Sequence, residues 1–459
     1  MMSRKFRKPD YETTLETRIS LGEALPANHL ARFVVDVVGQ LDLKPIYVRY
    51  SVRGGEAIAP EALFGLLFYG YATGRFSSRK IEKATYEDLG YRYVAGGLHP
   101  DHDTIAHFRK TFLPELHGLF IEILLMAKLT GILKVGNISL DGSKVHADAS
   151  KSKAVSYGRL IELEERLRNE VKQLFELGEQ ADQGEAMVPE GLVIEDEIAF
   201  RKERLENLAK AKAVLEARAK ERYELEKADY DAKMKEREEK AKEQGKKPRG
   251  KPPEPPQEGP NAKDQYNFTD PDSRIMKNST NSGYDQHYNA QVAVTQDTML
   301  IVATSLSNHP NDKREVEPTL DSLSPKLGQP EGAALDNGFF SEHNILALEQ
   351  RKIEPYIATG REPHYKSVHA LLGDLPAEPP ADASPKEKMA YKLATQIGKE
   401  IYRLRKCTLE PVIGIIKEVL GFRQFSLRGL ANAAGEWCLV CLAFNLKRMH
   451  TLFLAHSLY

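Results

Sequence analysis

A long charged segment in the middle of the chain limits the folds that this sequence can adopt. Residues 157–247 carry two helical patterns rich in Glu, Lys and Arg. The stretch between the two patterns, ELGEQADQGEAMVPEGLVIEDE, contains the Gly and Pro residues that a reversal of direction requires. The proline-rich QGKKPRGKPPEPPQEGP follows, and such a linker cannot be part of a core. We therefore expect residues 157–263 to be a helical hairpin with its linker, inserted into a domain that resumes after it.

Residues 1–133 have the pattern of a helical domain. PANHLARFVVDVVGQLDL and PEALFGLLFYGYATG place apolar residues at helical spacing, and Pro60 suits the first turn of a helix. Short helices joined by polar turns fit a DNA-binding domain, and they fit any small helical bundle equally well. The residues that can cap the later helices are Ser77, Ser78, Asp101 and Asp103.

The segments around the insertion, residues 134–156 and 264–459, alternate between strand and helix patterns. NISL precedes the insertion, and YDQHYNAQVAVT and TMLIVATSLS follow it, separated by QD in the manner of a β-hairpin. Further strand patterns at GAAL and IEPYIATG alternate with helical ones. This order is that of an α/β domain that the charged hairpin interrupts once.

Two aspartates come directly after apolar, strand-like runs. Asp141 follows NISL, and Asp336 follows AAL. A single Asp before Gly is usually a turn residue, but two of them at strand ends in one α/β sheet can converge where such sheets bind ligands. Their charges would then repel, and divalent metal ions would supply the missing countercharge. Asp148 is the alternative to Asp141, but an interval of seven residues puts it on the opposite face of an uninterrupted strand.

A third oxygen ligand is expected from a helix beside these strands, and YRLRKCTLEPVIGIIKEVLGF offers Glu410. Pro411 suits the first turn of a helix, which predicts that Glu410 lies at a helix N-terminus. Lys417 falls two turns further on the same face. A carboxylate that binds metal and a lysine that can touch phosphate would then share one surface.

With these residues identified, the chain resembles the DDE transposases of bacterial insertion sequences, in the subgroup with a helical N-terminal domain and a long helical insertion. YGYATGRFSSRKIEKATYEDLGYRYVAGGLHPDHDTIAHFRK resembles that N-terminal domain, whose motif ends in Asp-His-Asp-Thr-Ile followed by Phe-Arg. ISLDGSKVHADAS, GAALDNGFFSEHNI and the block that begins LEPVIGIIKEVLGF resemble the three catalytic segments. The resemblance maps the catalytic carboxylates, which are also the metal ligands, to Asp141, Asp336 and Glu410.

The resemblance implies an RNase H-like fold with a mixed sheet. Asp141 would lie on the first strand, Asp336 on the fourth, and Glu410 on a flanking helix. The family's Tyr-Arg-Glu-Lys signature matches at Tyr402, Glu410 and Lys417, while the position expected for its arginine holds Lys406, with Arg405 one residue earlier. Either of these two cations could contact DNA.

The activity implied is metal-dependent cleavage at the terminal inverted repeats of an insertion sequence, followed by attack of the new 3′-hydroxyl on target DNA. Two Mg²⁺ ions about 4 Å apart, or Mn²⁺ in their place, would be the cofactors. Joining two ends implies at least a homodimer. Recognition of the ends falls to the helical domain, whose basic side chains serve surface solubility equally well. The candidates are Arg75, Arg79, Lys80, Arg109 and Lys110.

Composition limits the compartment and the alternatives. Three cysteines are too few for a disulfide framework and indicate a reducing cytosol. The apolar run WCLVCLAF is far shorter than a membrane span, so we expect a cytoplasmic protein with no membrane partner. Its two cysteines, Cys438 and Cys441, are more readily buried thiols than zinc ligands. A catalytically silent DNA-binding relative and a helical scaffold remain the alternative functions.

Overall fold

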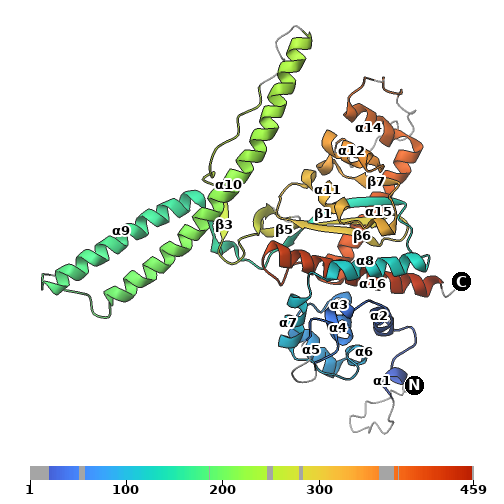
Figure 1. Cartoon of the computed structure of the whole chain (residues 1–459), viewed down its shortest axis with the longest axis horizontal. Helices are drawn as coiled ribbons and strands as arrows, with labels where there is room; N and C mark the ends of the chain where they lie inside the picture. The colour runs from blue at the N-terminus through green and yellow to red at the C-terminus, as the bar shows by residue number, and fades with distance from the viewer. Residues whose placement is uncertain are drawn as a thin grey trace, which may run out of the picture.

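The computed structural model describes residues 20–50, 57–185, 187–244, 252–278, 283–360, 377–380 and 382–456. A set of short N-terminal helices lies below a mixed sheet that has helices on both faces, and a long helical arm projects to one side (Figure 1). The chain is therefore α/β with a helical N-terminal region and an inserted arm, as the sequence predicts.

The N-terminal region forms the helices that the apolar spacing predicts. Pro60 occupies the first turn of its helix, and Asp101 caps a later one by accepting the Thr104 N–H at 2.7 Å. Ser77 precedes another helix without a side-chain capping bond. The helices are α1 (Leu21–Ala24), α2 (Leu30–Val38), α3 (Lys44–Tyr47), α4 (Pro60–Ala72), α5 (Ser78–Glu87), α6 (Leu89–Val94), α7 (His102–Thr111) and α8 (Leu116–Leu129).

Six strands form the mixed sheet of the second region. In the order β4-β5-β1-β7-β8, β1 pairs antiparallel with β5 and parallel with β7, β7 is parallel to β8, and β6 also pairs with β5. The predicted hairpin is the antiparallel pair of β5 and β6. The strands are β1 (Asn137–His146), β4 (Arg274–Lys277), β5 (Tyr284–Thr295), β6 (Ile301–Ser307), β7 (Gly332–Leu335) and β8 (Glu354–Ile357).

Helices cover the two faces of this sheet. In Figure 1, α11 (Val316–Asp321), α12 (Glu342–Gln350) and α14 (Pro385–Ala394) lie above it, whereas α8 and α16 (Leu430–His456) lie below it. The helix α15 (Gln396–Gly414) contacts β1, β7 and β8. Short 3-10 turns occur at Lys151–Lys153, Asp312–Arg314, Pro325–Leu327 and Asn337–Phe339, and a π-helical segment, Ile415–Val419, follows α15.

The position of Pro411 corrects one prediction. The proline lies inside α15, which begins at Gln396, so Glu410 is in the last third of a helix and not at its N-terminus. A proline in a helix interior removes one backbone hydrogen bond. The carbonyl that loses its donor belongs to Cys407, whose side chain is exposed, so water can reach this side of the helix.

The insertion contains the predicted helical hairpin, but its second helix continues well beyond the first. The helix α9 (Tyr157–Asp182) has 26 residues and α10 (Ile194–Gln244) has 51, which corresponds to about 77 Å. One half of α10 pairs with α9, and the helix then crosses β3 (Gln265–Asn267) and projects beyond it (Figure 1). A small core joins the arm to the two-stranded sheet of β2 (Ala154–Ser156) and β3.

A buried polar network joins the N-terminal helices to α16. Glu436 is fully buried and accepts hydrogen bonds from the Tyr71 hydroxyl at 2.9 Å and the Ser426 N–H at 2.8 Å. Arg109, 8% exposed, donates to the same hydroxyl at 2.8 Å and to the Phe76 carbonyl at 3.0 Å. This corrects the prediction that Arg109 contacts DNA, because its guanidinium group is used inside the core.

The apolar composition of α16 is that of a core helix. Residues Leu430–Ala455 are long and apolar enough to cross a membrane by length and composition, but 56% of the apolar window is buried inside the structure. The helix contacts β6, α4 and α8. Cys438 and Cys441 are buried free thiols within this helix. The sequence favoured this interpretation over a zinc site.

Candidate active site

Strand register brings Asp141 and Asp336 to adjacent positions. The parallel pairing of β1 with β7 ends at Leu140 and Leu335, and each aspartate is the next residue of its strand or turn. Asp141 does not end its strand, because β1 continues to His146 through its pairing with β5. The sequence prediction that the two aspartates converge therefore holds for a slightly different reason: the parallel ladder ends there, while β1 itself does not.

The environment of Asp141 opposes its negative charge. Burial, followed by the nearby charge of Asp336, raises its pKa to about 6. Arg405 opposes this effect by donating from Nη1 to Asp141 Oδ2 at 3.0 Å, and the Gly142 N–H donates to Oδ1 at 2.8 Å. The two carboxylates, Asp141 and Asp336, thus carry more negative charge than Arg405 neutralises.

Arg405, not Lys406, is the cation at these carboxylates. Its side chain is buried, 7% exposed, and its guanidinium carbon lies 5.6 Å from the centroid of the Tyr402 ring. Lys406 is exposed on another side of α15. Of the two candidates that the family signature leaves open, the structure puts Arg405 in contact with a predicted metal ligand.

A carboxylate that the sequence analysis missed, Asp312, lies beside the pair. Its charge contributes to the raised pKa of Asp141. Three side chains converge on Asp312 Oδ1 from neighbouring strands, and the donors are Lys144 Nζ at 3.4 Å, Asn289 Nδ2 at 2.7 Å and Gln291 Nε2 at 3.0 Å. A signal was present in the sequence, because Asp312 also follows a strand pattern, TMLIVATSLS, after a short loop.

Gly142 is required by a close approach and not by a turn. It lies opposite Gln291 in the antiparallel register, and a Cβ atom at this position would overlap the side-chain amide of Gln291. The missing side chain lets that amide cross β1 to reach Asp312. The residue after the first predicted catalytic aspartate therefore shapes the neighbouring carboxylate.

Two contacts hold α15 and the π-helical segment alongside β1, in the same direction. The Thr408 and Ser139 hydroxyls are 3.1 Å apart, and Lys417 Nζ donates to the carbonyl of Lys144 at 2.8 Å. Burial lowers the pKa of Lys417 below its ordinary value. The lysine predicted to touch phosphate is thus positioned against the strand that carries Asp141.

Glu410 is not brought together with the two aspartates. It comes two residues after Thr408, which contacts β1, so it lies on nearly the opposite side of α15 from the strand. Its side chain is exposed, and it forms no hydrogen bond or ion pair with another residue in the part of the chain that the structure describes. Among the described residues, no three His, Cys, Asp or Glu side chains are close enough together to form a metal site.

Asp141 and Asp336 nevertheless fit a divalent cation. Both supply the oxygen ligands that Mg²⁺ prefers, and a bound cation would stabilise the charged form of Asp141, which burial and the charge of Asp336 disfavour. Asp148, the alternative considered for Asp141, forms an ion pair with Arg428 at 2.8 Å on a partly exposed surface. The pair of aspartates at the end of the β1–β7 ladder is therefore the candidate catalytic centre.

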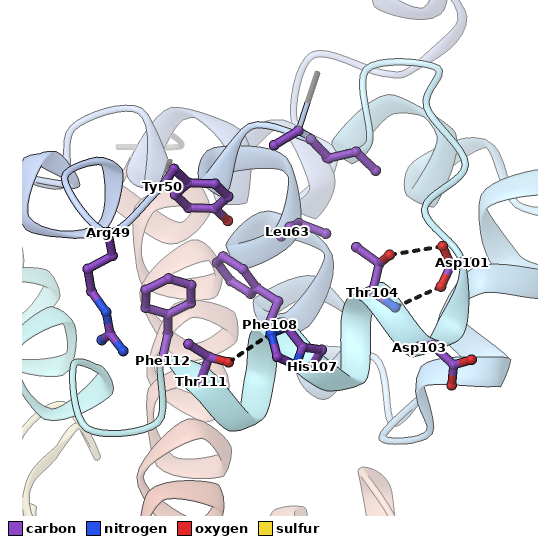
Figure 2. Close-up of a pocket in the computed structure, with 12 residues that line it drawn as sticks. Arg49, Tyr50, Leu63, Asp101, Asp103, Thr104, His107, Phe108, Thr111 and Phe112 are labelled. Carbon is purple, nitrogen blue, oxygen red and sulfur yellow. Dashed lines mark hydrogen bonds between the residues drawn. The ribbon is translucent and has the colours of Figure 1, made fainter. Parts of the chain in front are cut away.

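A cavity of about 820 Å³ in the N-terminal region is a separate feature. Figure 2 shows Thr104, His107 and Phe108 of α7 along its wall, with Asp101 accepting two hydrogen bonds from Thr104. The cavity contains none of the carboxylates of the sheet. Two predicted DNA contacts of this region, Arg79 and Lys80, are exposed at the start of α5.

Comparison with known protein families agrees with this arrangement. Residues 19–111 match the Transposase domain (DUF772), and residues 379–450 match the Transposase DDE domain. No curated protein and no solved structure is significantly similar to the chain. The helical N-terminal region, the sheet with its paired aspartates and these two matches define a transposase of the DDE class.

Within that class, the two matches support a DDE transposase of an insertion sequence. The second matched range contains Tyr402, Arg405, Glu410 and Lys417, and the N-terminal match contains Arg79 and Lys80. Asp141 and Asp336 lie between the two matched ranges, so their assignment depends on the sequence motifs and on the register of β1 with β7.

Proposed function

We propose that this transposase binds the terminal inverted repeats of its insertion sequence, cleaves the DNA there and joins the freed 3′-hydroxyl to target DNA. The observation that carries this proposal is the adjacency of Asp141 and Asp336 at the end of the β1–β7 ladder. Two carboxylates whose charges oppose one another need a cation, and divalent cations are the usual agents of phosphodiester cleavage.

Asp141 and Asp336 would hold the metal, Mg²⁺ or alternatively Mn²⁺, with Glu410 as the third ligand. When bound, two ions would activate a water molecule or a 3′-hydroxyl and stabilise the leaving oxygen. Glu410 is exposed on the side of α15 away from β1, so this part of the helix would have to rotate toward the strand as DNA and metal bind. Asp312 is the other carboxylate within the same electrostatic environment.

The cations around the centre would act on the DNA backbone. Arg405 donates to Asp141 and lies over the Tyr402 ring. It would therefore contact the DNA backbone next to the metal ligands. Lys417 and the exposed Lys406 would contact phosphates, and such contacts position DNA without reading its sequence. Arg79 and Lys80 are proposed to contact the element's ends.

A cleavage assay tests this proposal. The substrate is DNA containing the inverted repeats that flank the gene, and strand products are measured with and without Mg²⁺. Asp141→Asn and Asp336→Asn should abolish cleavage while retaining DNA binding, and Asp148→Asn is the matched control that should cleave normally. Cleavage by Asp141→Asn at the wild-type rate would overturn the assignment.

Two further comparisons refine the same experiment. Loss of cleavage in Glu410→Gln but not in Asp312→Asn identifies Glu410 as the third ligand, and the reverse result assigns that role to Asp312. DNA binding without cleavage by the wild-type protein under every divalent metal would favour a catalytically silent relative. The joining of two ends requires an assembly of at least two copies, and the expected site of action is the cytoplasm, where bacterial DNA is located.

A further inference from the structure

A cavity of about 750 Å³ lies where α10 crosses the edge of the catalytic domain. One wall is α10 itself, which contributes Arg218 and Leu225, and the opposite wall comes from β3 and β4 and the loop after β6. The cavity therefore belongs to the junction between the arm and the sheet and is separate from the paired aspartates.

Cationic side chains outnumber acidic ones around this cavity. Its lining includes five Arg or Lys side chains and three Asp or Glu side chains. One of those cations, Arg222, is already neutralised by Asp264, to whose oxygens its Nη1 donates at 3.0 and 3.1 Å. The remaining cations are Arg218, Lys263, Arg274 and Arg314, and the remaining acids are Glu221 and Glu226.

Arg274 is fixed in an orientation that leaves part of its guanidinium group available. Its Nη1 donates to the backbone carbonyls of Pro271, Asp272 and Ser273, each at 2.9 Å. Among the described residues, Nε and Nη2 of Arg274 have no hydrogen-bond partner, and the residue is half-buried. A guanidinium group held by carbonyls on one side presents its other donors to the cavity that it lines.

A second arginine adds an unsatisfied donor at the same place. Arg218 Nη1 is buried and has no hydrogen-bond partner among the described residues, although its Nη2 lies 3.9 Å from Asp272 Oδ1. A buried donor without a partner is unfavourable, and a bound acceptor would satisfy it. Burial, followed by the charge of Arg218, lowers the pKa of Arg274 to about 10, so an anion bound beside the two arginines would stabilise the charged form of Arg274.

The wall of the cavity continues into the catalytic centre. His309, Pro310 and Arg314 line the cavity, and Asp312 in the same loop lies beside the paired aspartates. Asp312 and Arg314 are the first and last residues of one 3-10 turn, about 4 Å apart along its axis. One short segment thus has an acidic side toward the metal ligands and a basic side toward the arm.

We propose that this cavity binds a backbone phosphate of the DNA that leaves the catalytic centre, with Arg274 and Arg314 as its main ligands and α10 as the opposing wall. The inference rests on the proposed function, because it requires DNA at the neighbouring carboxylates. It gives the arm a specific role: α10 closes over the backbone of the bound DNA close to the point of cleavage. Planar guanidinium groups suit the two-oxygen geometry of a phosphate.

The test uses the salt dependence of DNA binding by the full-length protein. Binding of a fluorescein-labelled, 40-base-pair duplex of mixed sequence is measured by anisotropy between 50 and 200 mM salt in EDTA. One lost phosphate contact reduces the slope of log Kd against log salt by about 0.9. The rise in Kd between 50 and 200 mM salt should therefore be about 3.5-fold smaller for the variant than for wild type. Arg314→Gln is the variant, and its exposed side chain makes it safe for folding.

Lys313→Gln is the matched control, because Lys313 is exposed in the same 3-10 turn but does not line the cavity. A reduced slope in Arg314→Gln with an unchanged slope in Lys313→Gln supports the proposal. Equal slopes in wild type and both variants, or equal losses in both variants, overturn it. Failure of the wild-type protein to bind DNA would refute the proposed function itself, whereas wild-type binding that Arg314→Gln leaves unaltered refutes only the phosphate site.

Discussion

Replacing Asp141 by Asn should stabilise the protein in the absence of divalent metal. Asn has nearly the shape of Asp and keeps an oxygen that can accept the hydrogen bond from Arg405. It removes the negative charge that burial and Asp336 disfavour. The substitution thus measures the cost of burying this charge, with the charge of Asp336 as the second contribution.

The magnitude follows from the pKa of Asp141, which is raised from 3.8 to about 6 in the folded protein. At about 1.36 kcal/mol per pKa unit, the charged form destabilises the fold by up to about 3 kcal/mol. This value already contains the opposing effect of Arg405. The pKa of Asp141 is higher in the folded than in the unfolded protein, so protonation of this group favours folding. The contribution of Asp141 to wild-type stability is therefore greatest below pH 3.8 and is lost as the pH rises through about 6.

Urea unfolding in EDTA, measured at a series of pH values from 4 to 8, checks this expectation. The two proteins should have similar free energies of unfolding near pH 4, and Asp141→Asn should be more stable by about 2–3 kcal/mol near pH 8. Mg²⁺ should then raise the midpoint of wild type and not that of the variant. A difference between the proteins that stays constant with pH would refute the reasoning.

Two other substitutions test the packing around the site and between the domains. Gly142→Ala should displace the Gln291 amide, reduce the free energy of unfolding by about 1–3 kcal/mol and slow cleavage, as measured by urea unfolding and by the strand-product assay. Glu436→Ala should cost about 3–5 kcal/mol, because it leaves the buried partners of this carboxylate unpaired, whereas Glu418→Ala at an exposed ion pair should cost less than about 1 kcal/mol. Equal midpoints for these last two variants in thermal unfolding would argue against a structural role of the buried network.

The sequence predicts the arrangement of elements well because the signals are local and repeated. Helical spacing and the position of Pro60 identify the N-terminal helices, and the alternation of strand and helix patterns identifies the sheet. The sequence also predicts that Asp141 and Asp336 converge, although they meet at the end of the β1–β7 ladder and not at the ends of two strands. The interruption by the arm follows from charge and proline content alone.

Features that depend on packing between distant segments escape such reasoning. Arg109 looks like a surface cation in its own helix, but it donates to the Tyr71 hydroxyl of α4 and to the Phe76 carbonyl inside the core. Pro411 resembles a helix start, but the contacts of α15 with the sheet hold it within a longer helix. Asp312 follows a strand after a loop, and its role depends on side chains from β1 and β5 that no local pattern connects.

The hydrophobic core has a consequence for how this enzyme can be divided. One continuous cluster of buried side chains extends from Leu25 in the N-terminal helices, through the sheet, to Met449 in α16. A fragment of residues 1–133 would expose the faces of α4 and α8 that α16 covers in the whole chain. The N-terminal region and the catalytic region should therefore unfold in a single cooperative transition, and exchange of one region between related transposases should succeed only when α16 is exchanged with it.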